Sequence, residues 1–229
     1  MALYAIGDLH LSLGGSKPMD IFGAAWTNHV ERLREAFSVL KEDDVIVLAG
    51  DISWGISLAE ALEDFKFIAS LPGRKIILKG NHDYWWATAK KMKEFFAAND
   101  IEGIEILYNN CFFYGDYAIC GTRGWFYEED AAGTHTGKML LREAQRLETS
   151  LAAAGDKKIL CFLHYPPLYQ GYQCPELLTL LDRYHVARCY YGHLHGPVIR
   201  RAFEGKRQET EYALISADYL GFVPKKICE

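Results

Sequence analysis

Metal-binding side chains follow several apolar runs of this 229-residue sequence, at the points where strands would end. The motifs are GDLH, GDIS, GNHD, LHYPP and GHLHG, in this order along the chain. Carboxylate, carboxamide and imidazole groups without thiolates suit Mn²⁺, Fe²⁺, Zn²⁺ or Mg²⁺. A single closed site would not use so many ligands, so we predict two ions about 3.5–4 Å apart. The candidate residues are Asp8, His10, Asp51, Asn81, His82, His164, His193 and His195.

Each motif alone is ambiguous, because Gly-Asp or Asp-x-His is commonly a turn or a helix cap. Motifs at the ends of successive strands favour one shared site, since loops leaving the carboxyl ends of neighbouring strands converge on one crevice in α/β sheets. His193 and His195 are two residues apart on an extended segment and can project to the same side. His29 and His185 lie in or near predicted helices and are interpreted as ordinary surface or partly buried groups.

Seven apolar runs predict the strands that position these motifs, and they alternate with segments of helical period, which is typical of an α/β fold. The predicted strands are 3–8, 45–51, 75–81, 117–122, 158–164, 188–193 and 212–216. The predicted helices are 30–40, 57–70, 85–98 and 138–153. The one long irregular stretch, 123–137, predicts a lid or substrate loop.

The composition is that of an ordinary globular protein. Half of the residues are hydrophobic, which is enough for the core of a single domain over 1–229. The net charge of -5 argues against a nucleic-acid partner. The start MALYAIGD carries no basic leader and no run approaches 18 apolar residues, so we expect a cytoplasmic protein with no membrane partner. Six cysteines without a CxxC pair predict reduced thiols rather than a zinc ribbon or disulfide framework.

The ordered set Asp-x-His, Gly-Asp, Gly-Asn-His-Asp, a lone His and Gly-His-x-His resembles the calcineurin-like metallophosphoesterase superfamily, and the match runs from Asp8 to His195. The resemblance implies a two-sheet β-sandwich flanked by α-helices, with the metal site at the carboxyl ends of the strands. It also implies two divalent ions, for which we expect Mn²⁺ or Fe²⁺/Fe³⁺, with Zn²⁺ or Mg²⁺ as alternatives.

The resemblance also assigns a role to each matching residue. Asp51 would bridge the two ions, and a metal-bridging hydroxide would attack phosphorus. His82 resembles the family's non-ligand histidine, which donates a proton to the leaving oxygen or stabilises developing charge. The first ion would be held by Asp8, His10 and His195, and the second by Asn81, His164 and His193.

The substrate is predicted from a departure from the family's protein phosphatases. Their second motif continues as Gly-Asp-x-x-Asp-Arg-Gly, whereas this chain has GDISWGI. The sequence is closer to the bacterial phosphodiesterase and small phosphohydrolase branch, so we predict a phosphodiester or small nucleotide-like phosphoester. A nuclease of the same superfamily and a metal-loaded protein-binding scaffold are the alternatives. The presence of His82 counts against the scaffold.

Three further residues are candidates for contact with the substrate. Arg123 could hold a phosphate in a bidentate fork or form a structural salt bridge. Trp54 and Tyr84 could stack on a nucleobase or pack within the fold. A fourth residue, Asp83, could orient His82 or brace the turn that carries it.

Overall fold

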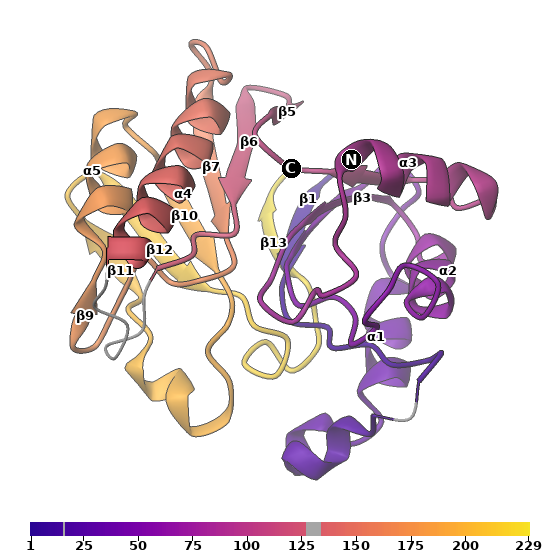
Figure 1. The fold of residues 1–229 in the computed structure, drawn as a ribbon. Helices are drawn as coiled ribbons and strands as arrows, with labels where there is room; N and C mark the ends of the chain where they lie inside the picture. The colour runs from indigo at the N-terminus through magenta and orange to yellow at the C-terminus, as the bar shows by residue number, and fades with distance from the viewer. Residues whose placement is uncertain (16, 127–133) are drawn as a thin grey trace. The chain divides into compact units, whose positions relative to one another are not determined.

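The computed structural model describes residues 1–15, 17–126 and 134–229 (Figure 1). The chain forms two compact units. Unit 1 comprises Met1–Ile106 and Ile215–Glu229, and unit 2 comprises Leu107–Leu214. Whether the two units act as the single domain that the sequence predicts stays a prediction.

Unit 1 is built on a five-stranded sheet in the order β13-β1-β2-β3-β4. Four neighbours, β1 to β4, are parallel, and β13 pairs antiparallel with β1 at the edge. The strands are β1 (Leu3–Ile6), β2 (Val45–Ala49), β3 (Arg74–Leu78), β4 (Ile104–Ile106) and β13 (Lys225–Cys228). Parallel neighbours need crossover connections, and helices supply them. They are α1 (His29–Phe37), α2 (Leu62–Ser70) and α3 (Ala89–Ala98), with the 3₁₀ helices η1 (Met19–Phe22) and η2 (Ala24–Trp26) before α1.

The core of unit 1 lies between one face of this sheet and its helices. Ile46 and Leu48 of β2 share a buried cluster with Phe37 of α1, Phe65 of α2 and Phe96 of α3. Each helix therefore presents an apolar stripe to the sheet, as its periodicity predicts.

Two helices of unit 1 begin later than the sequence predicts. Ser57 Oγ accepts a hydrogen bond from the Glu60 amide (3.3 Å), but this pair closes a turn and α2 begins at Leu62. Trp85 is buried and its indole N–H donates to Asp83, so it belongs to the preceding loop. Helix α3 begins after Thr88, whose hydroxyl accepts from the Lys91 amide and caps the helix.

Unit 2 is built on a six-stranded sheet in the order β11-β12-β10-β7-β6-β5, with a parallel centre and antiparallel strands at both edges. Its strands are β5 (Cys111–Tyr114), β6 (Tyr117–Thr122), β7 (Lys158–Leu163), β10 (Arg188–Tyr191), β11 (Gly205–Arg207) and β12 (Thr210–Leu214). A two-stranded sheet adds β8 (Leu168–Tyr169) and β9 (Tyr172–Gln173). The helices are α4 (Thr134–Ala152), α5 (Pro175–Arg183) and the 3₁₀ helix η3 (Gly196–Arg201). Two mixed sheets with helices confirm the predicted α/β class.

The core of unit 2 contains a row of cysteines. Cys111, Cys120, Cys161 and Cys189 lie opposite one another on β5, β6, β7 and β10. The last three share a buried cluster with the leucines of α4 and α5. All six cysteines of the chain are free thiols, and burial raises the pKa of Cys174 to about 11.

The sequence predicts an irregular stretch over 123–137, and its predicted end is wrong, because α4 already begins at Thr134. Its middle, 127–133, lies outside the described residues. In the described ranges, none of the helices combines the length and the apolar character that a membrane span requires.

Candidate metal centre

Two loops of unit 1 run side by side beyond the carboxyl ends of β1 and β2. The amides of Asp8 and His10 donate to the carbonyls of Gly50 and Asp51, each at 2.9 Å, so the pairing of the two strands continues into the loops. Asp8 consequently has a carboxylate oxygen within 4.8 Å of a His10 ring nitrogen, and one within 4.8 Å of an Asp51 carboxylate oxygen. His10 Nε2 lies 3.7 Å from Asp51 Oδ2. All three side chains are buried.

The backbone at these residues adopts a conformation that L side chains rarely take. Asp8, His10 and Asp51 have φ values of 59°, 47° and 49°, and His193 in unit 2 has 72°. Each such residue costs roughly 1–3 kcal/mol, and residues of this kind cluster at active sites. The left-handed turns bend the backbone sharply just where the donor side chains leave it.

Asp83 ties the loop after β2 to the loop after β3. Its fully buried carboxylate accepts hydrogen bonds from the amides of Asp51 (2.9 Å), Ile52 (2.8 Å) and Gly80 (2.7 Å), and from the Trp85 indole (3.1 Å). Of the two roles predicted for Asp83, these contacts match bracing the turn. The positions of Asp51 and of the following GNHD motif are thereby fixed relative to each other.

The GNHD motif itself lies against Asp51. The His82 amide donates to Asp51 Oδ1 at 2.7 Å. A Cβ atom on Gly80 would lie 2.1 Å from the same oxygen, so no residue larger than glycine fits there without displacing Asp51. Asn81, between them, is half-buried.

Trp54 forms one wall beside these residues. Its ring stacks on His10 with centroids 4.9 Å apart and lies 4.4 Å from the ring of His82. Lys17 places its ammonium 3.0 Å from the Trp54 ring centroid. Tyr84 is 62% exposed, with its ring 6.1 Å from that of His82. The two aromatic candidates for substrate contact therefore both lie beside His82.

Two buried polar residues of unit 1 support this arrangement and were not found from the sequence. Asp64 of α2 accepts from the Ser53 hydroxyl and from the Leu13 amide (2.7 Å). Burial raises the pKa of Asp64, and the bond from Ser53 partly opposes that effect. His29, interpreted as ordinary, lies edge-on to Trp26, and burial lowers its pKa. Asp64 was not found because an acidic residue in the first turn of a helix is common and gives no sequence signal that it holds a loop.

Unit 2 places its three candidate ligands after two paired strands. His164 follows β7, and His193 and His195 follow β10. The Gly192 amide donates to the His164 carbonyl (3.0 Å), and the rings of His164 and His193 lie 5.2 Å apart. Leu194 is buried while His193 and His195 are partly exposed, so these two histidines share a side of the segment.

Glu143, which no motif of the sequence singles out, braces unit 2. It projects from α4 and is 2% exposed. Its Oε1 accepts from the Thr122 hydroxyl (2.7 Å) and the Gly124 amide (2.9 Å), on either side of Arg123. The Arg123 carbonyl in turn accepts from the amide of His164 (3.2 Å). Glu143 therefore positions the segment on which the backbone of His164 rests.

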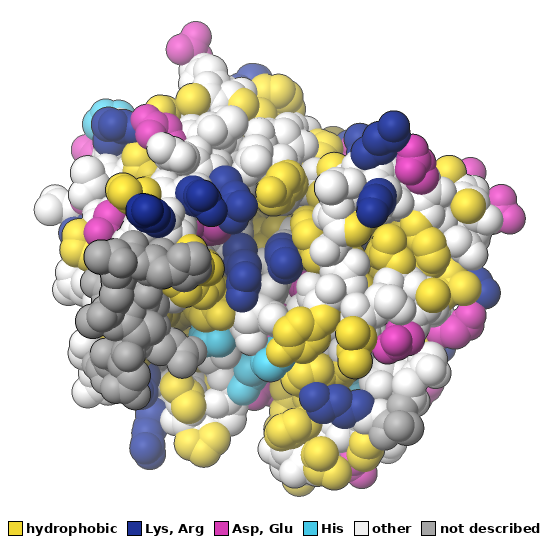
Figure 2. All heavy atoms as spheres, in the orientation of Figure 1, with side chains coloured by type: hydrophobic (Ala, Val, Ile, Leu, Met, Phe, Trp, Pro, Cys, Tyr) yellow, Lys and Arg dark blue, Asp and Glu magenta, His cyan; other side chains and the backbone are white. Residues whose placement is uncertain are grey.

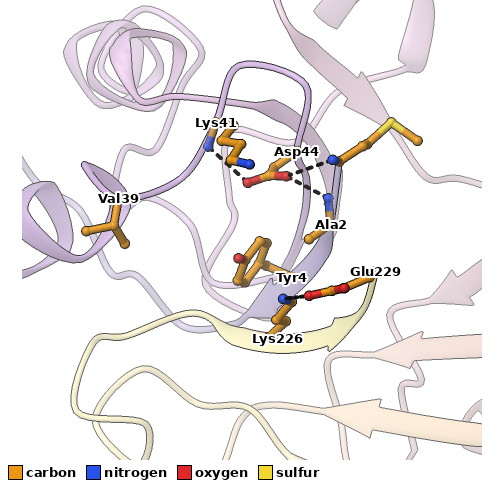
Figure 3. A pocket seen from close by; sticks show the side chains of 8 residues that line it. Ala2, Tyr4, Val39, Lys41, Asp44, Lys226 and Glu229 are labelled. Atoms are coloured by element: carbon orange, nitrogen blue, oxygen red, sulfur yellow. Dashed lines mark hydrogen bonds and ion pairs between the residues drawn. The ribbon is translucent and has the colours of Figure 1, made fainter.

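A cavity of about 260 Å³ lies at the opposite, amino end of the strands of unit 1. Figure 3 shows Asp44 there, accepting from the amides of Ala2 (2.6 Å) and Lys41 (2.9 Å), while Lys226 pairs with Glu229. Burial alone would raise the pKa of Asp44, but those two amide bonds and the N-terminal ammonium lower it overall. Asp44, Lys226 and Glu229 are thus bound to other groups of the chain, and we interpret the cavity as a structural feature.

The carboxylate and imidazole donors of unit 1 fit a hard or borderline divalent ion. Residues 1–197 match the family model of the calcineurin-like phosphoesterases. The chain therefore belongs to this family, a class of metal-dependent phosphoester hydrolases. It is accordingly a metal-dependent phosphoesterase.

Solved structures share the fold at low identity. Protein AQ665 of unknown function from Aquifex aeolicus is 17% identical with a TM-score of 0.54, over 98% of this chain and 95% of that chain. The phosphopantetheinyl hydrolase PptH from Mycobacterium tuberculosis is 14% identical with a TM-score of 0.58, over 99% and 95%. TT1561 from Thermus thermophilus is 10% identical with a TM-score of 0.59, over 99% and 97%. No curated relative matches the sequence.

Proposed function

We propose that this phosphoesterase uses two metal ions and hydrolyses a phosphodiester or a small nucleotide-like phosphoester. The observation that carries the proposal is the close grouping of donor atoms from Asp8, His10 and Asp51 on braced loops. The family pattern assigns the remaining ligand positions to Asn81, His164, His193 and His195. When bound, the ions would activate the attacking water and neutralise charge on the phosphoryl oxygens.

The residues of the chain have three tasks in this reaction. Asp8, His10 and His195 would hold one ion, Asn81, His164 and His193 the other, and Asp51 both. Asp83 keeps Asp51 and the GNHD loop in register before any ion binds. His82, whose amide is fixed on Asp51, would donate a proton to the leaving oxygen or stabilise its charge.

The choice of a diester or nucleotide-like substrate rests on two features. GDISWGI lacks the Asp-Arg pair of the protein phosphatases. Trp54 and Tyr84 offer aromatic surface next to His82, on which a base or an aryl group could stack. The net charge of -5 does not favour a long polyanion such as DNA.

The test uses protein freed of metal on a chelating resin and titrated with Mn²⁺, Fe²⁺, Zn²⁺ or Mg²⁺. Hydrolysis of bis(p-nitrophenyl) phosphate and of p-nitrophenyl phosphate is measured for the wild type, Asp51→Asn and His82→Ala. We expect metal-dependent turnover that prefers the diester and falls about a hundredfold or more in His82→Ala. His185→Ala is the matched control, because His185 is exposed and pairs with Glu209 on the surface.

Turnover without added metal, or an unchanged rate in His82→Ala, would contradict the mechanism. Tight binding of metal without turnover of either ester by any of these proteins would favour the scaffold alternative.

A further inference from the structure

A small cavity in unit 2 is lined by three arginines. It has a volume of about 120 Å³, and its walls are Arg123, Trp125, Met139, Arg142, Glu143 and Arg146. Arg142 and Arg146 are one helical turn apart on α4 and so lie on the same face of the helix. Figure 2 shows Lys and Arg side chains gathered over α4. The cavity thus concentrates positive charge in a chain whose net charge is negative.

Among the described residues, the acidic residue that lines the cavity, Glu143, is already bound to other groups. Glu143 Oε1 accepts from Thr122 and Gly124, and its Oε2 pairs with Arg146 Nη1 at 3.0 Å. Glu143 therefore compensates the charge of one guanidinium. Within the described ranges, Arg142 makes no ion pair, so the cavity retains an excess of positive charge.

Arg123 has unused hydrogen-bonding capacity. Its Nε is buried and finds no acceptor among the described residues. Its Nη2 lies 3.5 Å from the Tyr165 hydroxyl, at the long limit of a hydrogen bond, and the guanidinium carbon lies 5.5 Å from the Tyr165 ring centroid. A buried donor without an acceptor is unfavourable, and an anionic ligand would supply the missing acceptor.

We infer that Arg123, Arg142 and Arg146 bind a phosphate group of the substrate other than the one that is cleaved. Guanidinium groups bind phosphate oxygens through paired hydrogen bonds, and several on one cavity wall define a phosphate site. The Arg123 carbonyl accepts from the amides of His164 (3.2 Å) and Tyr165 (3.0 Å), so the anion site is linked through the backbone to a predicted metal ligand of the same unit. Trp125 supplies an aromatic wall beside it.

The existence of the anion site does not depend on the proposed function. Its role in binding the substrate does rest on the proposed function. The substrate would accordingly carry at least two phosphate groups. Glu143 is a positioning residue here, because it orients Arg146 and the Arg123 segment without needing to touch the ligand.

The first measurement uses metal-free protein, so that binding at the metal centre does not contribute. Pyrophosphate is titrated into the wild type, Arg142→Gln, Arg146→Gln and Arg183→Gln in a calorimeter at low salt. Arg183 is the matched control, because it is an exposed helical arginine paired with Glu148. We expect about a tenfold weaker affinity in each pocket variant and no change in Arg183→Gln.

The second measurement uses Mn²⁺-loaded protein and two diesters with the same leaving group. They are thymidine 5′-(p-nitrophenyl phosphate) and its 3′-phosphorylated form. We expect the wild type to prefer the 3′-phosphorylated diester in kcat/KM, and Arg142→Gln and Arg146→Gln to reduce that preference about tenfold, mainly through KM. Arg183→Gln should keep the wild-type preference.

The outcomes separate this inference from the proposed function. Pyrophosphate binding that is absent, or equal in the wild type and pocket variants, would overturn the anion site even if diesters are hydrolysed. Arginine-dependent binding without hydrolysis of either diester would support the anion site and contradict the proposed function. Hydrolysis without any preference for the phosphorylated diester would overturn the role in substrate binding.

Discussion

Each unit holds its strand-end loops with a buried carboxylate, but the two carboxylates come from different parts of the chain. In unit 1, Asp83 lies within the loop after β3 and binds the backbone of that loop and of the loop after β2. In unit 2, Glu143 reaches the loop after β6 from helix α4. The first carboxylate belongs to the GNHD motif itself, whereas the second comes from a helix that must pack against the loop.

The partners of the two braces also differ. Asp83 accepts from four backbone amides and from an indole, so both of its oxygens serve to fix the two loops. Glu143 uses one oxygen for the loop and the other for Arg146. A change in Asp83 should therefore disturb the fold of unit 1, while a change in Glu143 should first disturb the basic cavity.

Asp83→Asn tests the stronger brace and should have the largest effect. We expect a loss of about 3–5 kcal/mol in the free energy of unfolding. In the wild type the buried backbone donors share a charged acceptor, whereas in the variant some of them would face the amide nitrogen of asparagine. Urea denaturation of the metal-free protein measures it. Asp43→Asn, an exposed carboxylate near the N-terminus, should change stability by less than about 0.5 kcal/mol. A loss in Asp83→Asn no larger than in Glu143→Gln would break the comparison.

Lys75→Met tests a second difference between the two units. Strand β3 of unit 1 buries a lysine, whereas the central strands of unit 2 bury cysteines. Lys75 is 1% exposed, its ammonium donates to the Leu71 carbonyl, and burial lowers its pKa to about 8. Because the unfolded state binds more protons between pH 8 and about 10.4, this residue makes stability rise with pH in that window.

The expected contribution is about 3 kcal/mol across the window, and it should vanish in Lys75→Met. Buried thiols such as Cys174 oppose it in both proteins, so the quantity to measure is the difference in unfolding free energy between wild type and variant at each pH. A difference that stays constant from about pH 7.5 to about pH 10.5 would show that Lys75 does not titrate as proposed.

Glu143→Gln sharpens the comparison from the side of unit 2. The variant keeps one oxygen for the loop but loses the charged partner of Arg146, so we expect a loss of about 1–2 kcal/mol in unfolding free energy. Thermal and urea denaturation measure it. Glu148→Gln on the same helix removes a surface carboxylate paired with Arg183, and it should cost at most about 1 kcal/mol. Equal losses in the two variants would mean that Glu143 is no brace.

Asp44→Asn should have the smallest effect of these variants. Asp44 binds two backbone amides at the amino end of the sheet of unit 1. The pKa of Asp44 is lowered in the folded state, so its contribution is complete above the unfolded pKa near 4 and is lost as pH falls through the folded pKa. We expect a loss of about 1 kcal/mol at pH 7 that shrinks below about pH 4. Urea denaturation from pH 7 to pH 3 checks it, and a loss that does not depend on pH would contradict it.

The sequence predicted the parallel centre of each sheet but not the edges. Val45–Ala49 is buried at every residue, and such runs are apolar throughout and easy to recognise. The edge strands β11 and β13 are short, and most of their residues are partly or fully exposed. Helix α5 was also missed, although it starts at a proline and buries a leucine stripe. Its apolar residues are adjacent in the sequence and obscure the helical period.

The sequence also predicted which residue types gather after the strands, but not how the loops are held. Motif order selected Asp51, His82 and Asp83 together. Asp64 and Glu143 act through the backbone of distant loops, and a lone acidic residue in an amphipathic helix is indistinguishable from a solvated one. Only the three-dimensional packing reveals them.

The left-handed backbone at Asp8, His10, Asp51 and His193 has a consequence for how this protein would change under selection. Glycine would relieve the strain at each of the four positions, and every such change would remove a donor side chain. A library selected only for heat resistance should therefore accumulate glycine at these residues, whereas a library selected for turnover should never do so. The two libraries would thus identify the site without any knowledge of its ions or substrate.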